Sequence, residues 1–316
     1  MERKTHAAEE KTPKEVSKPA AYQPWDLHNW MKFLSERAPP LFFLMMAAGP
    51  CLSILYSKTE GFPIEKFIWA ILGEQVLLLL VRIMDDVKDY EKDKIVHPDR
   101  PLPRGLIKFE EVSLFLNIAM LSTVVYGVLL GLRYGAPVGV SYEFQVAYGY
   151  LMYVEFGVGE WLEKNPFLYS FTHEISAFLI PMFLTSLRGD GLFSWEGLFS
   201  GCLIFSSFFS YDICRKLDPY LPKLKGTYLV IYGKWPVFVA TSVLSAMGMI
   251  ASYALDLHGL LWPLQLALVG SVLLLTVLPP QSRSSKRHKP VEILSAVNLI
   301  LHLWVPFFAK LLSSQQ

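Results

Sequence analysis

Long apolar segments, separated by short polar stretches, follow one another along most of the chain. A membrane-spanning helix needs roughly 20 mainly apolar residues, and nine segments come close to this length: about 37–57, 67–86, 112–132, 142–162, 166–187, 195–212, 235–256, 260–278 and 291–311. Most are apolar on all sides, whereas helices of soluble proteins carry a polar face. The pattern predicts an all-α, polytopic membrane protein of about nine transmembrane helices around a central cavity.

The charged residues agree with this prediction. The chain of 316 residues is 53% hydrophobic and 18% charged, and its formal net charge of +1 does not indicate a class of partner. For a membrane protein of this kind we expect no nucleic-acid partner. Lys and Arg gather before the first segment and after the second, sixth and eighth segments, as the positive-inside rule requires of cytoplasmic loops. We therefore expect residues 1–24 to be a disordered cytoplasmic tail and 25–312 to form one nine-span domain in the lipid bilayer of the plasma membrane.

A short amphipathic stretch precedes the first apolar segment. Residues 24–36, PWDLHNWMKFLSE, alternate Trp, Leu, Met and Phe with polar residues. This composition is typical of a helix that lies at the membrane surface. An ordinary linker before the first span is the alternative.

An acidic block ends the second apolar segment. Asp85, Asp89 and Asp93 are spaced i, i+4, i+8, and Asp86 lies three residues before Asp89. If the helix continues past the membrane surface, these carboxylates share one face. Mg²⁺ prefers oxygen ligands and is commonly held by one or two carboxylates together with phosphate oxygens. The block therefore predicts a Mg²⁺ site, and the alternative is a solvated helix end neutralised by the neighbouring lysines.

A basic, proline-rich stretch follows directly. KDKIVHPDRPLPRG supplies Lys94, Arg100 and Arg104, and its three prolines prevent a continuous helix. Arginine makes fork-like contacts with phosphate groups. A carboxylate–metal site beside such a loop is suited to binding and ionising an allylic diphosphate.

The acidic block resembles a known motif. DDVKDYEKD, residues 85–93, resembles the first aspartate-rich motif of the UbiA superfamily of intramembrane prenyltransferases, NDxxDxxxD, with Asp85 in the Asn position. The HPDRPLPRG that follows and the expected nine spans are also similar to that family. The resemblance implies Mg²⁺-dependent transfer of a prenyl group from a prenyl diphosphate donor to a small aromatic or lipid-like acceptor. It implies that Asp85, Asp86, Asp89 and Asp93 hold the metal and the donor, with Arg100 and Arg104 assisting.

The second motif of the family, usually DxxxD after the sixth span, is incomplete. The chain reads SYDICRKLDPYLPKLKG, in which Asp212 is followed by Arg215 and Lys216, and Asp218 comes two residues later. Either Lys216 replaces the second acid, or Asp218 survives as part of the motif. One explanation is that Arg215 and Lys216 contact the diphosphate directly. The other is a non-catalytic protein of the same fold that binds or carries a divalent cation or a lipid diphosphate.

Further ionisable residues lie in the apolar segments on the same side as the acidic block. Glu155, Glu160 and Glu163 fall at the end of the fourth segment, and His173 and Glu174 near the start of the fifth. Ionisable groups inside a membrane commonly face a cavity. We expect Glu155, His173 and Glu174 to line the acceptor pocket, with one of them acting as a general base. Hydrogen bonds between helices are the alternative role.

Overall fold

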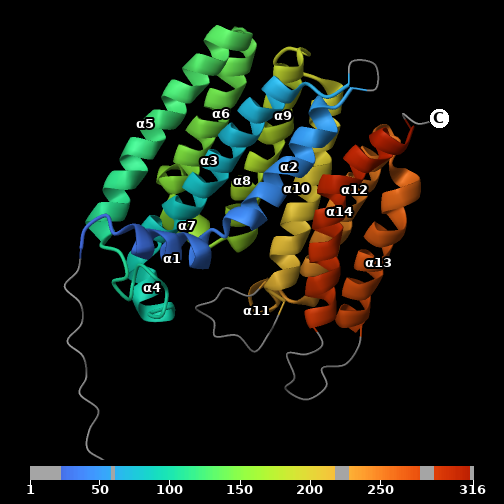
Figure 1. Cartoon of the computed structure of the whole chain (residues 1–316). Helices are drawn as coiled ribbons and strands as arrows, with labels where there is room; N and C mark the ends of the chain where they lie inside the picture. The colour runs from blue at the N-terminus through green and yellow to red at the C-terminus, as the bar shows by residue number, and fades with distance from the viewer. Residues whose placement is uncertain (1–22, 58–60, 218–227, 278–287, 314–316) are drawn as a thin grey trace, which may run out of the picture.

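The computed structural model describes residues 23–57, 61–217, 228–277 and 288–313. In these residues the chain forms helices and connecting turns (Figure 1), with one isolated bridge between Ser57 and Gly61. The helices are α1 (Leu27–Arg37), α2 (Pro40–Leu55), α3 (Ile64–Lys88), α4 (Tyr90–Val96), α5 (Phe109–Tyr134), α6 (Ala136–Tyr153), the 3₁₀ turn η1 (Glu155–Gly157), α7 (Gly159–Glu163), α8 (Pro166–Glu174), α9 (Ser176–Arg188), α10 (Trp195–Arg215), α11 (Tyr228–Tyr232), α12 (Lys234–Ala254), α13 (His258–Val277) and α14 (Lys289–Ser313). The predicted tail, residues 1–24, lies almost wholly outside the described residues.

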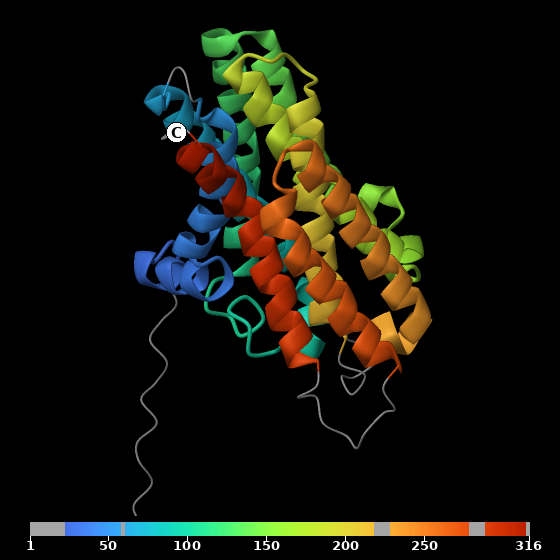
Figure 2. The same cartoon turned by 90° about the vertical axis from the view of Figure 1, so that its right-hand side faces the viewer.

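The predicted all-α membrane fold is confirmed, and the count of nine spans is approximate. Each predicted segment coincides with helical structure. By length and composition, seven of the described helical segments can cross a membrane, or eight if the bent pair α1 and α2 forms one span. The helices run side by side in the views of Figures 1 and 2, and in Figure 1 the α5–α6 pair lies at one side and α12, α13 and α14 at the other. Helix α10 packs against α9, α12 and α14, and it is the most enclosed span.

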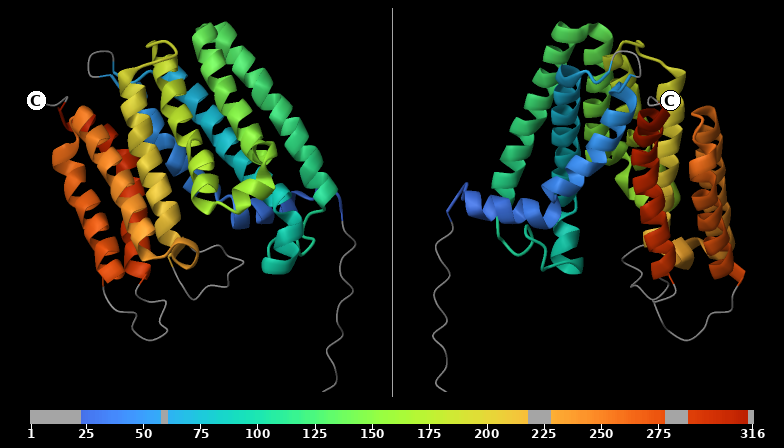
Figure 3. Two further views of the ribbon diagram at one scale, coloured as in Figure 1. Left: turned by 180° about the vertical axis from the view of Figure 1, so that it is seen from behind. Right: turned by 45° about the vertical axis from the view of Figure 1, so that its right-hand side comes forward.

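Helix α1 lies across one end of the bundle, as the right-hand view of Figure 3 shows. The chain bends by 55° between α1 and α2, where Pro39 and Pro40 interrupt the helix. The indole Nε1 of Trp30 donates a hydrogen bond to Glu111 at the start of α5, over 2.5 Å. The amphipathic helix expected over 24–36 is therefore present, and its tryptophan fixes it to the neighbouring helix.

The fourth predicted span, 142–162, has different bounds in the structure. Helix α6 begins after Gly135 (φ 103°) and ends at Tyr153. Glu155 and Phe156 then adopt positive φ angles of 50° and 55°, a left-handed conformation that residues with side chains rarely adopt. Glu155, Glu160 and Glu163 consequently lie in the turn and short helix after α6, not inside a continuous span.

Candidate active site

The first aspartate motif occupies a break between two helices. Helix α3 ends at Lys88, and Asp89 (φ −84°, ψ 5°) separates it from the short helix α4. The prediction of one continuous helix is therefore wrong at this point. The acids also differ in exposure: the side chain of Asp85 is 41% exposed, whereas those of Asp86 and Asp93 are 4% and 6% exposed.

Two of the four acids are held by arginines. Asp86 accepts hydrogen bonds from Arg37 at the end of α1, with Nε 3.0 Å from each carboxylate oxygen, and a longer contact of 3.4 Å from Arg82. Arg100 donates to both oxygens of Asp93 over 2.7 and 2.6 Å. These bidentate pairs are strong, directional contacts. The Asp86 pair fixes α1 against α3, and the Asp93 pair fixes the loop after α4.

The other two acids are less constrained. Asp85 lies 3.6 Å from Lys88 and 3.8 Å from Arg82, which are ion-pair distances rather than hydrogen bonds. Asp89 lines a cavity, and burial raises the pKa of its carboxyl above the ordinary value, against the opposing influence of Lys88. Asp89 is thus a carboxylate at which a bound cation would be favoured.

Two predicted diphosphate ligands lie away from this cavity. Lys94 pairs with Glu91 over 2.7 Å and covers the ring of Tyr90. Arg104 forms a two-pronged contact with Glu36, over 2.8 and 2.7 Å. The structure thus gives both cations partners of their own, and neither lines the cavity.

The second motif ends helix α10. Asp212 is buried and accepts hydrogen bonds from Ser170 (2.9 Å), Tyr228 (2.8 Å), Arg215 (2.6 and 3.0 Å) and Lys216 (3.0 Å). Both basic residues that interrupt the DxxxD pattern therefore bind the surviving aspartate. Asp218, the alternative acid, lies outside the described residues.

One polar cavity joins the two motifs. It has a volume of about 540 Å³. It is lined from four parts of the chain by Asp89, Lys92, Asp93, Val96, His97, Arg100, Tyr211, Arg215, Lys216 and Glu292. The sequence did not point to Tyr211 and Glu292 in this cavity, or to Ser170 and Tyr228 as partners of Asp212. Tyr211 precedes a predicted acid and could have been included, but Glu292 follows a separate apolar segment and has no motif around it.

The predicted acceptor residues form a second network beside Asp85. Lys88 donates to the hydroxyl of Tyr169 over 2.7 Å and lies 3.7 Å from Glu155. The ring of His173 stacks on Tyr169 with centroids 4.2 Å apart. Lys88 therefore connects Asp85 of the first motif to residues from η1 and α8.

His173 and Glu174 differ in their surroundings. The Nδ1 atom of His173 lies 2.8 Å from the backbone carbonyl of Tyr169, which only accepts hydrogen bonds. Nδ1 therefore carries the proton, and the buried Nε2, which has no hydrogen-bond partner in the described residues, is an acceptor. Glu174 interacts electrostatically with Asp212, Arg215 and Lys216 of the second motif and, less strongly, with Asp85.

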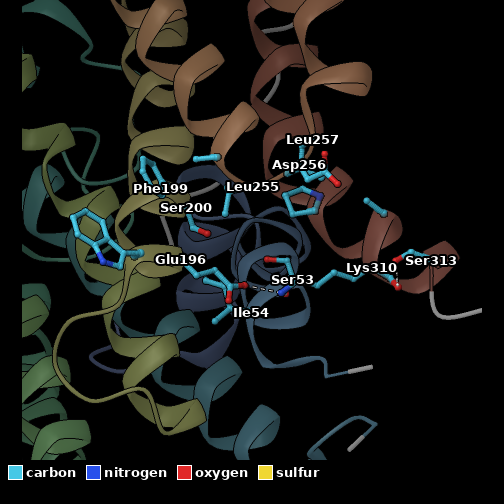
Figure 4. Close-up of a pocket in the computed structure, with 14 residues that line it drawn as sticks. Ser53, Ile54, Glu196, Phe199, Ser200, Leu255, Asp256, Leu257, Lys310 and Ser313 are labelled. Carbon is cyan, nitrogen blue, oxygen red and sulfur yellow. Dashed lines mark hydrogen bonds and ion pairs between the residues drawn. The ribbon is translucent and has the colours of Figure 1, made fainter. Parts of the chain in front are cut away.

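A different cavity lies at the opposite end of the bundle (Figure 4). It has a volume of about 610 Å³, and Lys310 in its wall binds Glu196 and the backbone carbonyl of Ser53, each over 2.7 Å. Glu196 is near the start of α10, and Arg215 is its last residue, so roughly 30 Å of helix separates this cavity from the motifs. It shares no lining residue with the polar cavity.

The carboxylates of the site fit a metal ion that takes most of its ligands from the bound substrate. Within the described residues no three His, Cys, Asp or Glu side chains are arranged to hold a metal ion. Asp85 and Asp89 are nevertheless two carboxylates without an arginine fork, which matches the usual binding of Mg²⁺ by one or two carboxylates, phosphate oxygens and water. Asp212 does not fit, because its lone pairs are already used by four donor side chains.

The fold and the sequence profile are similar to those of known proteins. No curated protein sequence matches the chain. The fold is similar to a solved structure reported as "Structural and mechanistic insights into the biosynthesis of Digeranylgeranylglyceryl phosphate synthase in membranes", with a TM-score of 0.63 and 17% identity over 89% of this chain and 99% of the other. The sequence profile of the UbiA prenyltransferase family matches residues 42–301. The chain therefore belongs to the UbiA prenyltransferase family.

Proposed function

We propose that the protein transfers a prenyl group from an isoprenoid diphosphate to a small aromatic or lipid-like acceptor, in a Mg²⁺-dependent reaction. One observation carries the proposal: a single polar cavity is lined by the first motif, through Asp89 and Asp93, and by the second, through Arg215 and Lys216. The cavity lies where membrane-length helices end. A substrate with an anionic head and an apolar tail matches such a boundary.

The donor side of the reaction needs charge stabilisation. When the allylic C–O bond of the donor breaks, the electron pair leaves with the diphosphate. Four cations line the cavity, and three of them, Arg100, Arg215 and Lys216, offset that charge. Asp85 and Asp89 would hold Mg²⁺, which when bound supplies further positive charge to the leaving group.

The acceptor side needs a base. The new C–C or C–O bond releases a proton from the acceptor. In the tautomer set by the Tyr169 carbonyl, Nε2 of His173 is able to take it. Glu155 and Glu174 are the other proposed acceptor-side groups: the first lies 3.7 Å from Lys88, and the second interacts electrostatically with Asp212.

We propose that the motif end faces the cytoplasm, so that the N-terminus is cytoplasmic, and that the membrane is the plasma membrane. The orientation is supported by the Lys and Arg that gather in the loops at this end.

The alternative is a non-catalytic protein that binds or carries a divalent cation or a lipid diphosphate. The observation that favours it is the neutralised Asp212, which leaves one half of the site without a metal-binding acid. A transferase releases diphosphate from the donor. A carrier binds the donor and leaves it intact.

The test is diphosphate release by the purified protein in nanodiscs. The protein is given Mg²⁺, C10–C20 and longer prenyl diphosphates, and a lipid and quinone-precursor extract. We expect the wild type to release diphosphate, Asp89→Asn to lose this release, and Asp256→Asn to retain it. Asp256 is a matched control because its side chain is 97% exposed at the opposite end of the bundle. Mg²⁺-dependent donor binding without release from any pool would contradict the transferase and favour the carrier.

A further inference from the structure

The buried carboxylate of Asp212 works as an anchor for two cations. Its oxygens receive hydrogen bonds from Arg215, Lys216, Ser170 and Tyr228. A carboxylate offers about four acceptor positions, and these donors use them. To ligate a metal ion, Asp212 would have to give up such contacts inside a site where it is only 5% exposed.

The two cations keep donors for another partner. Arg215 donates hydrogen bonds to Asp212 from Nε and from one hydrogen of Nη2. A guanidinium carries five N–H groups and an ammonium three, so Arg215 retains three and Lys216, which lies 2.9 and 3.0 Å from the two oxygens of Asp212, retains at least one. Their side chains are 50% and 33% exposed, and both line the polar cavity. Asp212 therefore fixes the cations while their free hydrogens remain available there.

The cavity's acids do not compete strongly for these donors. Asp93 is held by Arg100 and Glu292 by Lys289, over 2.6 and 2.7 Å. Four cations line the cavity, Lys92, Arg100, Arg215 and Lys216, against three acids, Asp89, Asp93 and Glu292. An anion with several phosphate oxygens suits this lining.

We propose that Arg215 and Lys216, positioned by Asp212, bind the diphosphate of the donor directly, so that the second half of the site works without a metal ion. The inference rests on the proposed function for the identity of the anion. It predicts a site that binds one divalent ion, at the Asp85 and Asp89 side, and that retains affinity for diphosphate when the metal is removed.

The first test measures binding rather than turnover. Inorganic diphosphate is titrated into the purified full-length protein by calorimetry, in Mg²⁺ and in EDTA. Wild type should bind in EDTA, and Arg215→Gln and Lys216→Gln should each weaken that binding by about tenfold to a hundredfold, as expected for a hydrogen bond between charged groups. Arg133→Gln, which removes an arginine paired with Glu65 outside the site, is the matched control. No binding in EDTA, or equal losses in all three variants, would overturn the proposal.

Metal stoichiometry gives a second, independent readout. Mn²⁺ binding, followed by electron paramagnetic resonance with inorganic diphosphate present, should saturate at one ion per protein, and two ions would refute the inference. Lys216→Asp restores the DxxxD spacing and should remove most of the EDTA-resistant binding. Asp212→Asn should weaken it as well, because both cations lose their anchor. Unchanged EDTA-resistant binding in either variant would contradict the proposed arrangement.

These results separate the inference from the proposed function. EDTA-resistant binding that depends on Arg215, in a protein that never releases diphosphate from a donor, would leave the inference standing and remove the transferase. If the protein releases diphosphate from a donor but binds diphosphate only when metal is present, the transferase stands and the inference is removed.

Discussion

Substitution of Asp86 separates two roles for the same carboxylate. The sequence motif makes it a metal ligand, whereas in the structure it is only 4% exposed and is held by the fork of Arg37. Asp86→Asn removes the negative charge and keeps the shape. If the structural role is correct, the variant loses stability and retains Mg²⁺-dependent donor binding.

The size of the effect follows from burial. The Arg37 side chain is 13% exposed, so without Asp86 its charge is left largely desolvated, although Arg82 lies close by. Breaking a buried ion pair from one side costs roughly 3–5 kcal/mol. Asparagine still accepts one hydrogen bond, so we expect about 3 kcal/mol, or a fall in Tm of roughly 5–10 °C. The double variant Arg37→Met/Asp86→Asn should recover part of this loss, because no unpaired charge remains.

The cysteines supply the assay. Cys51 and Cys214 are free thiols with exposures of 0% and 1%, so a thiol-reactive fluorophore reports unfolding in detergent. Asp89→Asn is the matched acid variant, and it should leave the Tm within about 1–2 °C of wild type while losing Mg²⁺-dependent donor binding, since burial already disfavours the charge of this carboxyl and no arginine depends on it. An unchanged Tm with lost donor binding in Asp86→Asn would refute the structural assignment.

Three further outcomes are expected. Glu74→Gln should leave the Tm unchanged or raise it, because this fully buried carboxyl has Gln145 as its bonded partner and its Oε2 has none in the described residues. Gly139→Val should lower the Tm by several degrees, because a Cβ there would lie 2.8 Å from a backbone atom of α5, whereas Gly270→Ala has no such neighbour. His173→Ala should raise the KM for the acceptor without changing donor affinity in Mg²⁺, measured by initial rates and calorimetry; an unchanged acceptor KM would remove His173 from the acceptor site.

The sequence predicts the helices well because each membrane span is a long and nearly uninterrupted run of apolar residues. Apolar runs of about 20 residues need only length and composition to be recognised. The error falls at the end of the fourth segment, where Tyr153 is followed by the left-handed Glu155 and Phe156. Backbone geometry of that kind depends on what the turn packs against, and the residues themselves have no turn signature apart from Gly157.

The spacing of the acids along the chain does not by itself predict where each side chain points. The i, i+4 rule holds only while the helix continues, and beyond the break at Asp89 the carboxylate of Asp93 accepts a hydrogen bond from Arg100. Glu292 reaches the same cavity from the last described helix. Its position depends on tertiary packing of α14 against α10, which no local pattern in the sequence encodes.

The ion pairs of the site lower the cost of holding many charged side chains at a membrane boundary. Acids that bind metal, and cations that bind phosphate, are costly near lipid when both ligands are absent. In the described site Asp86, Asp93 and Asp212 are each matched by arginine. Asp89 alone among the motif acids lines the cavity without such a fork. The site is therefore close to neutral before the donor arrives, and an incoming metal–diphosphate pair would meet Asp89 on one side and Arg215 on the other.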